Sequence, residues 1–230
     1  MKKPVLLIPF AAPQKELSYL LTDSADGMPF ARSLSGLDLD AFSSVCVVLL
    51  KQDALRWGMT ERIAAGFAAA GFVEPEFLLL EQPTESQPAT IAAALTALSV
   101  QGPFWVKDPD NYFRTEVVAD NVVTAFPLDA LTRVNPQNKS YLSISDADYV
   151  MNIAEKRIIG RYFCSGGYGF ADAARFLAVF GGLEHLGRLY LSHIIYRMLL
   201  DGESFRPLYV EDYQDWGTRE DWLEFSRRKN

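Results

Sequence analysis

Two carboxylates separated by one residue follow a short apolar run in the middle of the chain. Asp108 and Asp110 flank a proline directly after the apolar residues 104–106. Hard divalent cations such as Mg²⁺ take oxygen ligands, typically one or two protein carboxylates, with substrate phosphates completing the shell. The same residue types are also typical of a reverse turn, so this segment taken alone leaves a metal site and a turn as alternatives.

Another aspartate, Asp215, occupies a comparable position near the end of the chain. It follows the apolar run 205–210 and precedes the helical pattern 219–228. Asp215 could bring a second carboxylate to a cation held by Asp110. Trp216, next to it, belongs either to the core or to the wall of the same pocket.

A polar loop, residues 81–90, leads into a helical pattern and contains Gln82 and Ser86. The free amides at the start of a helix can receive an anion or a nucleobase edge. Serine is equally common as an N-cap, so a capped helix start is the alternative.

Two further segments contain residues suited to ligand binding. Glu155 and Lys156 follow a strand-like run, and a lysine there could reach a phosphate as a point charge or remain solvated. Gly166 and Gly167 interrupt another strand-like segment, which indicates either a close approach of backbone to ligand or a bulge.

The elements expected to position these residues alternate in the first half of the chain. Short continuous apolar runs are typical of strands buried on both faces, and the runs between them have helical spacing. Strand, helix, strand, helix, strand is the order of an α/β fold with a parallel core. The expected strands cover residues 4–10, 44–50, 77–80 and 104–106, and the expected helices run through 53–70 and 88–98.

The second half of the chain has a different pattern. Strand-like runs at 121–126, 141–145 and 149–154 have no room for helices between them, which predicts antiparallel or mixed pairing added to the parallel core. The patterns 171–180, 185–200 and 219–228 predict helices. The 230 residues contain no repeat and no low-complexity linker, so we expect one domain over residues 1–230.

Composition limits the classes of partner. Lys and Arg total 22 against 29 Asp and Glu, a formal charge of -7 that argues against nucleic acid or an anionic membrane as partner. The two cysteines, Cys46 and Cys164, lie in apolar runs and predict buried thiols in a reducing compartment. No run approaches the roughly 20 apolar residues of a membrane span, so we expect a cytoplasmic protein.

Taken in order along the chain, these segments resemble the sugar-phosphate nucleotidyltransferases, especially those of bacterial capsule and surface-polysaccharide loci. The resemblance is firm over about residues 77–222. It rests on the polar loop 82–90, Asp110, the Glu155-Lys156 pair, residues 165–168 and residues 215–218.

The resemblance implies a Rossmann-like nucleotidyltransferase fold of the GT-A-like type, with a mixed central sheet flanked by helices and a small antiparallel lobe. It implies an enzyme that joins an NTP to a phosphorylated acceptor, such as a sugar phosphate, and releases pyrophosphate. Mg²⁺ is the implied cofactor, capsule or lipopolysaccharide precursor synthesis the implied pathway, and a homo-oligomer a possible assembly.

Residue roles follow from the same resemblance. Asp110 and Asp215 look like the paired Mg²⁺ carboxylates, and Lys156 looks like the lysine that meets the acceptor phosphate. Gln82 and Ser86 look like the nucleobase-reading segment. The acceptor side would comprise Glu155, Gly167 and Trp216.

One departure from the family concerns the triphosphate. Family members follow their first strand with a glycine-rich loop containing an arginine and, later, a Pro-Lys pair. Here residues 11–16 contain no glycine, and Phe30 follows Pro29. Lys15 and Arg32 are the candidate substitutes for the missing cations.

Three hypotheses therefore follow from the sequence. The first is an active Mg²⁺-dependent nucleotidyltransferase with an unusual triphosphate loop. The second is a nucleotidyltransferase-like subunit that binds a nucleotide or sugar phosphate without transfer. The third is a metal-dependent glycosyltransferase of related fold that uses the Asp108-Pro109-Asp110 segment.

Overall fold

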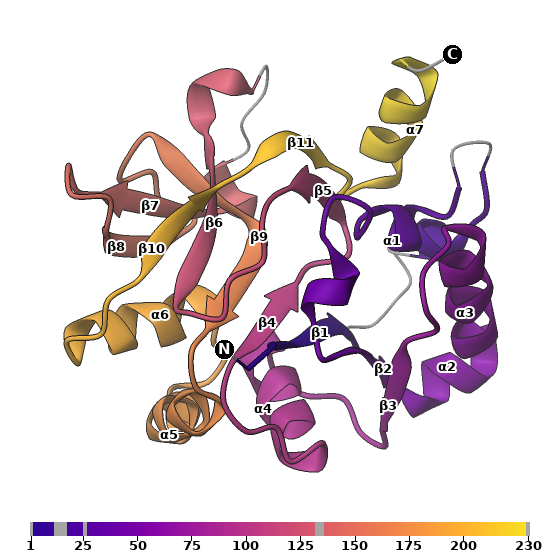
Figure 1. Cartoon of the computed structure of the whole chain (residues 1–230), viewed down its shortest axis with the longest axis horizontal. Coiled ribbons are helices and arrows are strands. Elements are labelled where there is room, and N and C mark those ends of the chain that lie inside the picture. The colour runs from indigo at the N-terminus through magenta and orange to yellow at the C-terminus, as the bar shows by residue number, and fades with distance from the viewer. Residues whose placement is uncertain (1, 12–17, 25–26, 132–135, 229–230) are drawn as a thin grey trace.

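The computed structural model describes residues 2–11, 18–24, 27–131 and 136–228 and centres on a mixed β-sheet (Figure 1). Within these residues the main sheet has nine strands. They are β1 (Val5–Phe10), β2 (Ser44–Leu50), β3 (Glu76–Leu80), β4 (Phe104–Lys107), β6 (Val122–Pro127), β7 (Ser140–Ile144), β8 (Val150–Glu155), β9 (Tyr162–Phe170) and β10 (Arg206–Tyr209).

The strand order is β10-β6-β9-β4-β1-β2-β3, with β7 pairing with β8 and β9. Strands β4, β1, β2 and β3 are mutually parallel, as the apolar runs of the first half predict. Strand β9 is antiparallel to both β4 and β6, and β7 of the β7–β8 hairpin pairs antiparallel with the first residues of β9, Tyr162 and Phe163. The predicted α/β class, with a mixed sheet flanked by helices and an antiparallel lobe, is confirmed.

A second, two-stranded sheet was not predicted. Strand β5 (Asn111–Arg114) pairs antiparallel with β11 (Glu211–Asp215), two segments about a hundred residues apart in sequence. We expected a turn at the first segment and a loop at the second. Their mixed polar composition gives no strand signal, so only the pairing itself defines them as strands.

Helices cover both faces of the main sheet (Figure 1). On one face lie α4 (Gln87–Ala97), α5 (Ala173–Leu183) and α6 (Leu191–Leu200), whose apolar residues share a core with β1, β4 and β9. The other face is covered by α1 (Pro29–Arg32) and α3 (Met59–Ala69), whereas α7 (Arg219–Arg228) packs beside β11. Helix α2 (Lys51–Trp57) follows β2. None of the helices in the described part of the chain is long and apolar enough to cross a bilayer.

Aromatic side chains pack α5 against the sheet. Phe104 of β4 stacks on Phe170 of β9 with ring centroids 4.9 Å apart, and Phe176 of α5 meets the two rings edge-on at 5.4 and 5.0 Å. All three side chains are fully buried. Each such pair adds roughly 0.5–1.5 kcal/mol beyond the burial of its area.

Two predicted helices differ from those observed. The pattern 53–70 forms two helices, because Gly58 adopts the left-handed conformation (φ +56°) and ends α2 where α3 begins. The pattern 185–200 forms a helix only from Leu191, after the exposed residues 184–188. The strands predicted at 121–126, 141–145 and 149–154 are confirmed within one or two residues.

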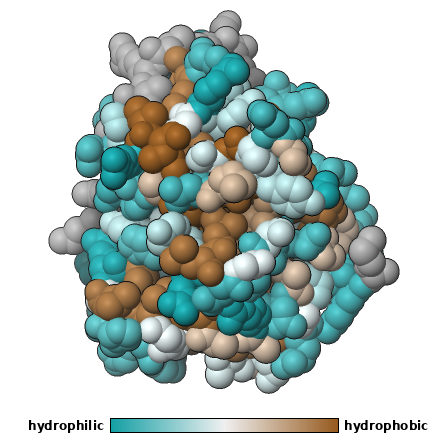
Figure 2. All heavy atoms as spheres, turned by 90° about the vertical axis from the view of Figure 1, so that its left-hand side faces the viewer, coloured by the Kyte–Doolittle hydropathy of each residue, from teal (hydrophilic) through white to brown (hydrophobic). Residues whose placement is uncertain are grey.

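The face that carries β7, β8 and α6 exposes apolar side chains among polar ones (Figure 2). Met151 of β8 and Leu200 of α6 are 63% and 65% exposed. Scattered exposed apolar residues are normal in a soluble chain. The expectation of a homo-oligomer stays a prediction.

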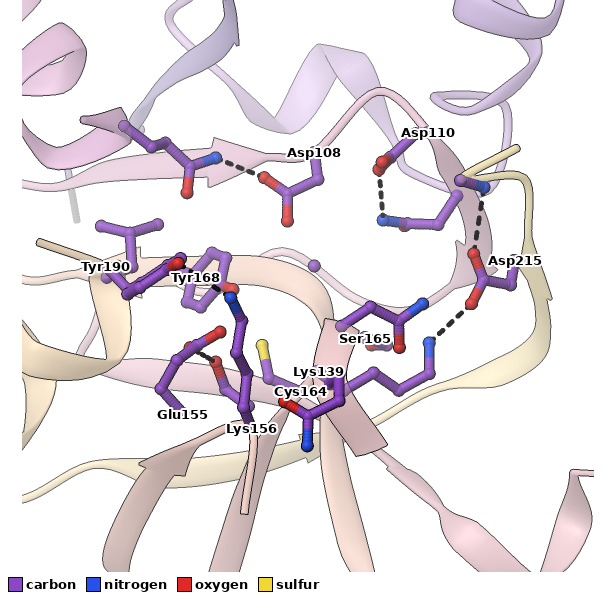
Figure 3. A pocket seen from close by; sticks show the side chains of 18 of the residues that line it. Asp108, Asp110, Lys139, Glu155, Lys156, Cys164, Ser165, Tyr168, Tyr190 and Asp215 are labelled. Atoms are coloured by element: carbon purple, nitrogen blue, oxygen red, sulfur yellow. Dashed lines mark hydrogen bonds and ion pairs between the residues drawn. The ribbon is translucent and has the colours of Figure 1, made fainter. Parts of the chain in front are cut away.

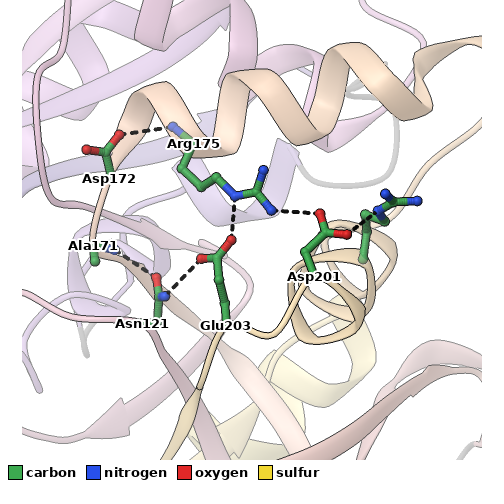
Figure 4. A network of polar contacts seen from close by, with 7 residues as sticks. Asn121, Ala171, Asp172, Arg175, Asp201 and Glu203 are labelled. Atoms are coloured by element: carbon green, nitrogen blue, oxygen red, sulfur yellow. Dashed lines mark hydrogen bonds and ion pairs between the residues drawn. The ribbon is translucent and has the colours of Figure 1, made fainter.

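A polar network joins α5, the end of α6 and the start of β6 (Figure 4). The Arg175 guanidinium donates to Glu203 and, at 2.7 Å, to Asp201. Asn121 donates to the other Glu203 oxygen at 3.3 Å. Hydrogen bonds from Arg175 and Arg197 lower the pKa of Asp201. The network therefore depends on charged carboxylates.

Asp201→Asn should lower the melting temperature at pH 7 by about 2 °C. A carboxyl whose folded pKa is depressed contributes its stability above the unfolded value, about 3.9, and loses it as the pH falls through the folded pKa. The difference from wild type should therefore disappear at acid pH. Thermal unfolding from pH 7 to pH 2 measures this difference in melting temperature.

The control is Asp129→Asn, which removes a single exposed ion pair with Arg161 and should change the melting temperature less. An equal change would contradict the role of the network.

Candidate active site

A cleft of about 420 Å³ opens beyond the carboxyl ends of β4, β8 and β11 (Figure 3). Its lining combines residues from both halves of the chain. Charged side chains are prominent in it, namely Asp108, Asp110, Glu155, Asp215, Asp221, Lys139, Lys156 and Arg188. Ligands of open α/β sheets bind beyond the carboxyl ends of the strands, so this is the expected place for a site.

The β5–β11 pairing brings Asp110 and Asp215 together. Asp215 lies opposite Asn111 in the register, and the Trp216 N–H donates to the Asp110 carbonyl at 2.9 Å. A methyl group on Gly217 would lie 3.1 Å from Asp215 Oδ1 and 4.0 Å from Asp110 Oδ2. The two carboxylate oxygens therefore lie at most about 7 Å apart, in the same part of the cleft.

A buried lysine holds Asp215 in place. Lys139 Nζ donates to Asp215 Oδ2 at 2.6 Å and to the Tyr213 hydroxyl at 3.0 Å, and its side chain is only 8% exposed. The other Asp215 oxygen accepts the Gly217 N–H at 3.0 Å. Lys139 is not recognisable as a site residue from the sequence, because a buried lysine just before a strand has the same sequence signal as a solvated one.

A second buried lysine fixes the loop between β4 and β5. Lys107 is fully buried, and its ammonium donates to the Asp108 carbonyl at 2.6 Å and to the Asn111 carbonyl and side-chain oxygens at 2.9 and 2.7 Å. Burial lowers the pKa of Lys107 to about 8. This lysine, also missed from the sequence, sets the backbone that presents Asp110.

The two carboxyls of this loop differ in their surroundings. Asp108 Oδ1 accepts a hydrogen bond from Gln87, at the start of α4, at 2.5 Å. Burial, with a smaller contribution from Asp110, raises the pKa of Asp108 to about 7. Burial raises the pKa of Asp110 too, as does the neighbouring Asp215, whereas Lys107 opposes the rise. Two like charges held together in this way favour a bound cation.

The donor set fits Mg²⁺. Carboxylate oxygens are the hard ligands that this ion prefers, and it commonly uses only one or two of them. The described residues contain no cluster of three or more His, Cys, Asp or Glu side chains able to hold a metal. A cation at Asp110 and Asp215 would therefore complete its shell with water and substrate oxygens.

At the other end of the cleft lie Glu155 and Lys156. Glu155 Oε2 accepts hydrogen bonds from Ser140 at 2.6 Å and from Ser192, on α6, at 2.9 Å. Lys156 adopts a left-handed backbone (φ +57°), and its ammonium donates to the Tyr190 hydroxyl at 2.9 Å. A non-glycine residue in that conformation costs about 1 kcal/mol or more and is a frequent feature of functional sites. Glu155 and Lys156 thus share the cleft with Asp110 and Asp215.

Strand β9 forms part of the cleft wall, but through a different glycine from the predicted one. Gly166 (φ +92°) lines the cleft, and a side chain there would collide with Asn111 at 2.3 Å. Gly167 instead exchanges hydrogen bonds of 2.8 and 3.0 Å with Thr124 of β6, inside the sheet. The neighbouring Ser165 is 1% exposed, and its hydroxyl has no hydrogen-bond partner among the described residues.

Trp216 does not line the cleft. Its side chain is fully buried, and its ring packs against Trp222 of α7 with centroids 4.9 Å apart and against Tyr112 of β5 at 6.0 Å. The Tyr19 hydroxyl donates to the Trp216 carbonyl. The core alternative for this tryptophan is therefore the observed one, and its contribution to the site is to anchor the loop that carries Asp215.

Three of the predicted nucleotide-binding residues, Gln82, Ser86 and Arg32, are not among the residues that line this cleft. Gln82 is exposed before α4, and Ser86 caps that helix by accepting the Ala89 N–H at 3.3 Å. Ser86 also lines a separate cavity of about 290 Å³. Arg32 lies over the Phe225 ring of α7 at 5.2 Å. Lys15 lies outside the described residues.

Solved structures with this fold are numerous. A nucleoside-diphosphate-sugar pyrophosphorylase from Vibrio cholerae RC9 aligns over 96% of this chain and 99% of its own, with a TM-score of 0.77 and 16% identity. The inositol-1-phosphate CTP transferase from T. maritima aligns over 96% and 92%, with a TM-score of 0.73 and 11% identity. A UDP-glucose pyrophosphorylase complexed with UDP-glucose aligns over 100% and 98%, with a TM-score of 0.72 and 11% identity.

These similarities establish a Rossmann-like nucleotidyltransferase fold over essentially the whole chain. At identities of 11–16% they extend to the fold alone. No protein-family model matches the sequence, and neither does any curated protein. Any activity must therefore be argued from the cleft itself.

Lys107→Met should lower the free energy of unfolding by about 3 kcal/mol, because three buried oxygens lose their donor and Asp108 loses its compensating charge. Urea denaturation measures the loss. Lys51→Met, at a lysine that is 45% exposed, should stay within about 0.5 kcal/mol of wild type. A loss below about 1 kcal/mol for Lys107→Met would show that the loop does not depend on this ammonium.

Proposed function

We propose that this chain, as one domain over residues 1–230, is a Mg²⁺-dependent nucleotidyltransferase that joins an NTP to a phosphorylated acceptor and releases pyrophosphate. The observation that carries the proposal is the convergence of Asp110 and Asp215 in the cleft that also contains Lys156. The three structural neighbours support the same class, since they are described as sugar pyrophosphorylases and a CTP transferase.

In the proposed reaction an oxygen of the acceptor phosphate attacks the α-phosphorus of the NTP. The bond from that phosphorus to the oxygen bridging to the β-phosphate breaks, and pyrophosphate leaves with the electron pair. Negative charge gathers on phosphoryl oxygens, so the main requirements are alignment and cationic stabilisation. Asp110 and Asp215 would hold Mg²⁺, which supplies the charge that neutralises these oxygens.

The acceptor end of the cleft suits a phosphorylated polyol. Lys156 would hold the acceptor phosphate by a charge-assisted hydrogen bond. Glu155 Oε2 accepts from two serines, and Glu155 Oε1, which has no hydrogen bond among the described residues, would accept hydroxyl donors. The presence of both a lysine and a carboxylate at this end of the cleft supports a sugar phosphate as substrate. From the resemblance of the sequence to the sugar-phosphate nucleotidyltransferases of polysaccharide loci, we propose that the product is a nucleotide-sugar precursor of capsule or lipopolysaccharide.

One observation favours a second candidate, a nucleotide-binding subunit without transfer. Residues 11–16 contain no glycine, and phenylalanine follows Pro29. Without small residues the backbone cannot wrap closely around phosphates.

For the transferase, we propose that Lys15 and Arg32 compensate in part for the missing cations of the triphosphate loop. We also propose that the protein acts in the cytoplasm on small molecules.

Asp110→Asn should reduce pyrophosphate release at least about 10³-fold, because one of two metal ligands is lost where charge develops. The assay combines Mg²⁺, each of the four NTPs and a panel of sugar phosphates, and detects pyrophosphate enzymatically. Asp146→Asn, at an exposed turn position, is the matched control and should match wild type.

Two other results would replace the proposal. Nucleotide binding by wild type without pyrophosphate from any NTP and acceptor would favour the binding subunit. Release of a nucleoside diphosphate from a nucleotide sugar would favour a glycosyltransferase. Pyrophosphate release unaffected by Asp110→Asn would remove the aspartate pair from the mechanism.

Lys156→Met should raise the KM for the acceptor by about 30-fold, the effect of losing a charge-assisted hydrogen bond of about 2 kcal/mol. The KM for the NTP should stay close to wild type, because the lysine lies at the acceptor end. Steady-state kinetics with each substrate varied in turn separates the two. Arg157→Met, which removes the next and exposed cation, is the control; a rise in both KM values for Lys156→Met would show that the lysine does not discriminate between the substrates.

A further inference from the structure

The most unusual charged group in the cleft is the ammonium of Lys139. Its side chain is almost completely buried, although the three residues that precede it, Pro136, Gln137 and Asn138, are exposed. Burial of an unpaired ammonium is strongly unfavourable. Here it is compensated by Asp215 at 2.6 Å, by the Tyr213 hydroxyl at 3.0 Å, and by the faces of the Phe163 and Tyr213 rings at 4.7 and 5.2 Å.

The main chain of the same residue reaches the other end of the cleft. The Lys139 carbonyl accepts the Lys156 N–H at 2.8 Å, and the next pair along the β7–β8 ladder is Ser140 with Glu155. Lys156 has a left-handed backbone that needs such fixed surroundings. One residue therefore contacts an aspartate of the proposed metal pair through its side chain and the proposed acceptor lysine through its backbone.

The side-chain contact also decides which Asp215 oxygen is available. Oδ2 faces Lys139, whereas Oδ1 lies beside Gly217 and on the side of Asp110. The lysine thus orients the carboxylate and subtracts one unit from the negative charge of the pair. With one divalent cation bound, the two aspartates and Lys139 together would carry a charge of +1, which favours the arrival of a polyphosphate.

Resting on the proposed function, we infer that Lys139 is a positioning residue that orients Asp215 and Lys156 toward each other and acts as a fixed counter-charge within the metal site. A fixed positive charge beside a cation site weakens the binding of free metal while it improves the site for an anionic substrate. A purely structural role would give a different result, because loss of Lys139 would then weaken metal binding and also impair the reaction of the anionic substrate.

The test measures Mn²⁺ binding to the free protein by calorimetry, together with steady-state kinetics. Lys139→Met should bind Mn²⁺ about tenfold more tightly than wild type, since the counter-charge is gone. Its kcat should fall about 100-fold, because Asp215 and Lys156 are no longer held in register. Lys139→Arg, which keeps the charge, should retain the wild-type Mn²⁺ affinity and recover part of the kcat.

Two controls separate the inference from the proposed function. Asp110→Asn should abolish the Mn²⁺ signal, which locates the binding at the aspartate pair, and Lys51→Met should leave affinity and kcat unchanged. If Lys139→Met proves unable to fold, Lys139→Gln provides the neutral variant for the same measurements.

The outcomes are distinguishable. Mn²⁺ binding that depends on Asp110 but is equal or weaker in the neutral Lys139 variant would overturn the inference and leave the proposed function standing. Wild-type protein without binding that depends on Asp110 would overturn both. Tighter Mn²⁺ binding with reduced kcat, and its reversal in Lys139→Arg, would support the counter-charge role.

Discussion

The antiparallel pairing of β5 with β11 is the constraint on which the candidate site depends. It places two carboxylates at one edge of the cleft, although the segments that carry them are separated by most of the second half of the chain. Backbone hydrogen bonds supply the register, and the buried Trp216 ring anchors the second segment from behind. Repulsion between the two neighbouring carboxylates destabilises the folded state, so it must be compensated by positive groups of the chain or by a bound cation.

Two buried lysines compensate for this repulsion. Lys107 donates a hydrogen bond to Asn111, in the segment that presents Asp110, and Lys139 forms an ion pair with Asp215. A buried ammonium is costly unless its hydrogen bonds are satisfied, and both lysines have acceptors for theirs; removing either lysine would leave its buried acceptors without a donor. The same arrangement leaves the cleft able to hold a cation together with anionic substrates.

The central sheet relates the two ends of the cleft. Strand β9 lies between β4, which leads to Asp110, and β6, and it contributes the residues around Gly166 to the wall. The β7–β8 hairpin extends the sheet and carries Glu155 and Lys156 to the opposite end. The proposed metal pair, beyond β4 and on β11 of the two-stranded sheet, and the proposed acceptor lysine, beyond β8 of the main sheet, are thus all carried by strands or by residues next to them. Groups on such rigid elements keep their relative positions, which the proposed reaction would require.

The sequence by itself determined the elements whose side chains have one uniform environment. The apolar runs of β1, β2 and β4 predict strands because both of their faces are largely buried, and the apolar run of β3 predicts the partly buried strand at the edge of the sheet. Helical spacing predicts the helices that cover the sheet. Asp110, beyond β4, and Lys156, beyond the antiparallel strand β8, could be located because each follows a strand-like run and ligands of such folds bind beyond strand ends. These inferences need only local pattern and the rules of α/β topology.

Only the tertiary structure decided the contacts between distant segments. Strands β5 and β11 have mixed polar sequences and exist because they pair with each other. The burial of Lys107 and Lys139, the choice of Gly166 over Gly167, and the core position of Trp216 depend on neighbours supplied by other parts of the chain. A side chain's local sequence fixes its chemistry, whereas its solvation and its partners are set by the packing around it, and for charged groups those two quantities determine the role.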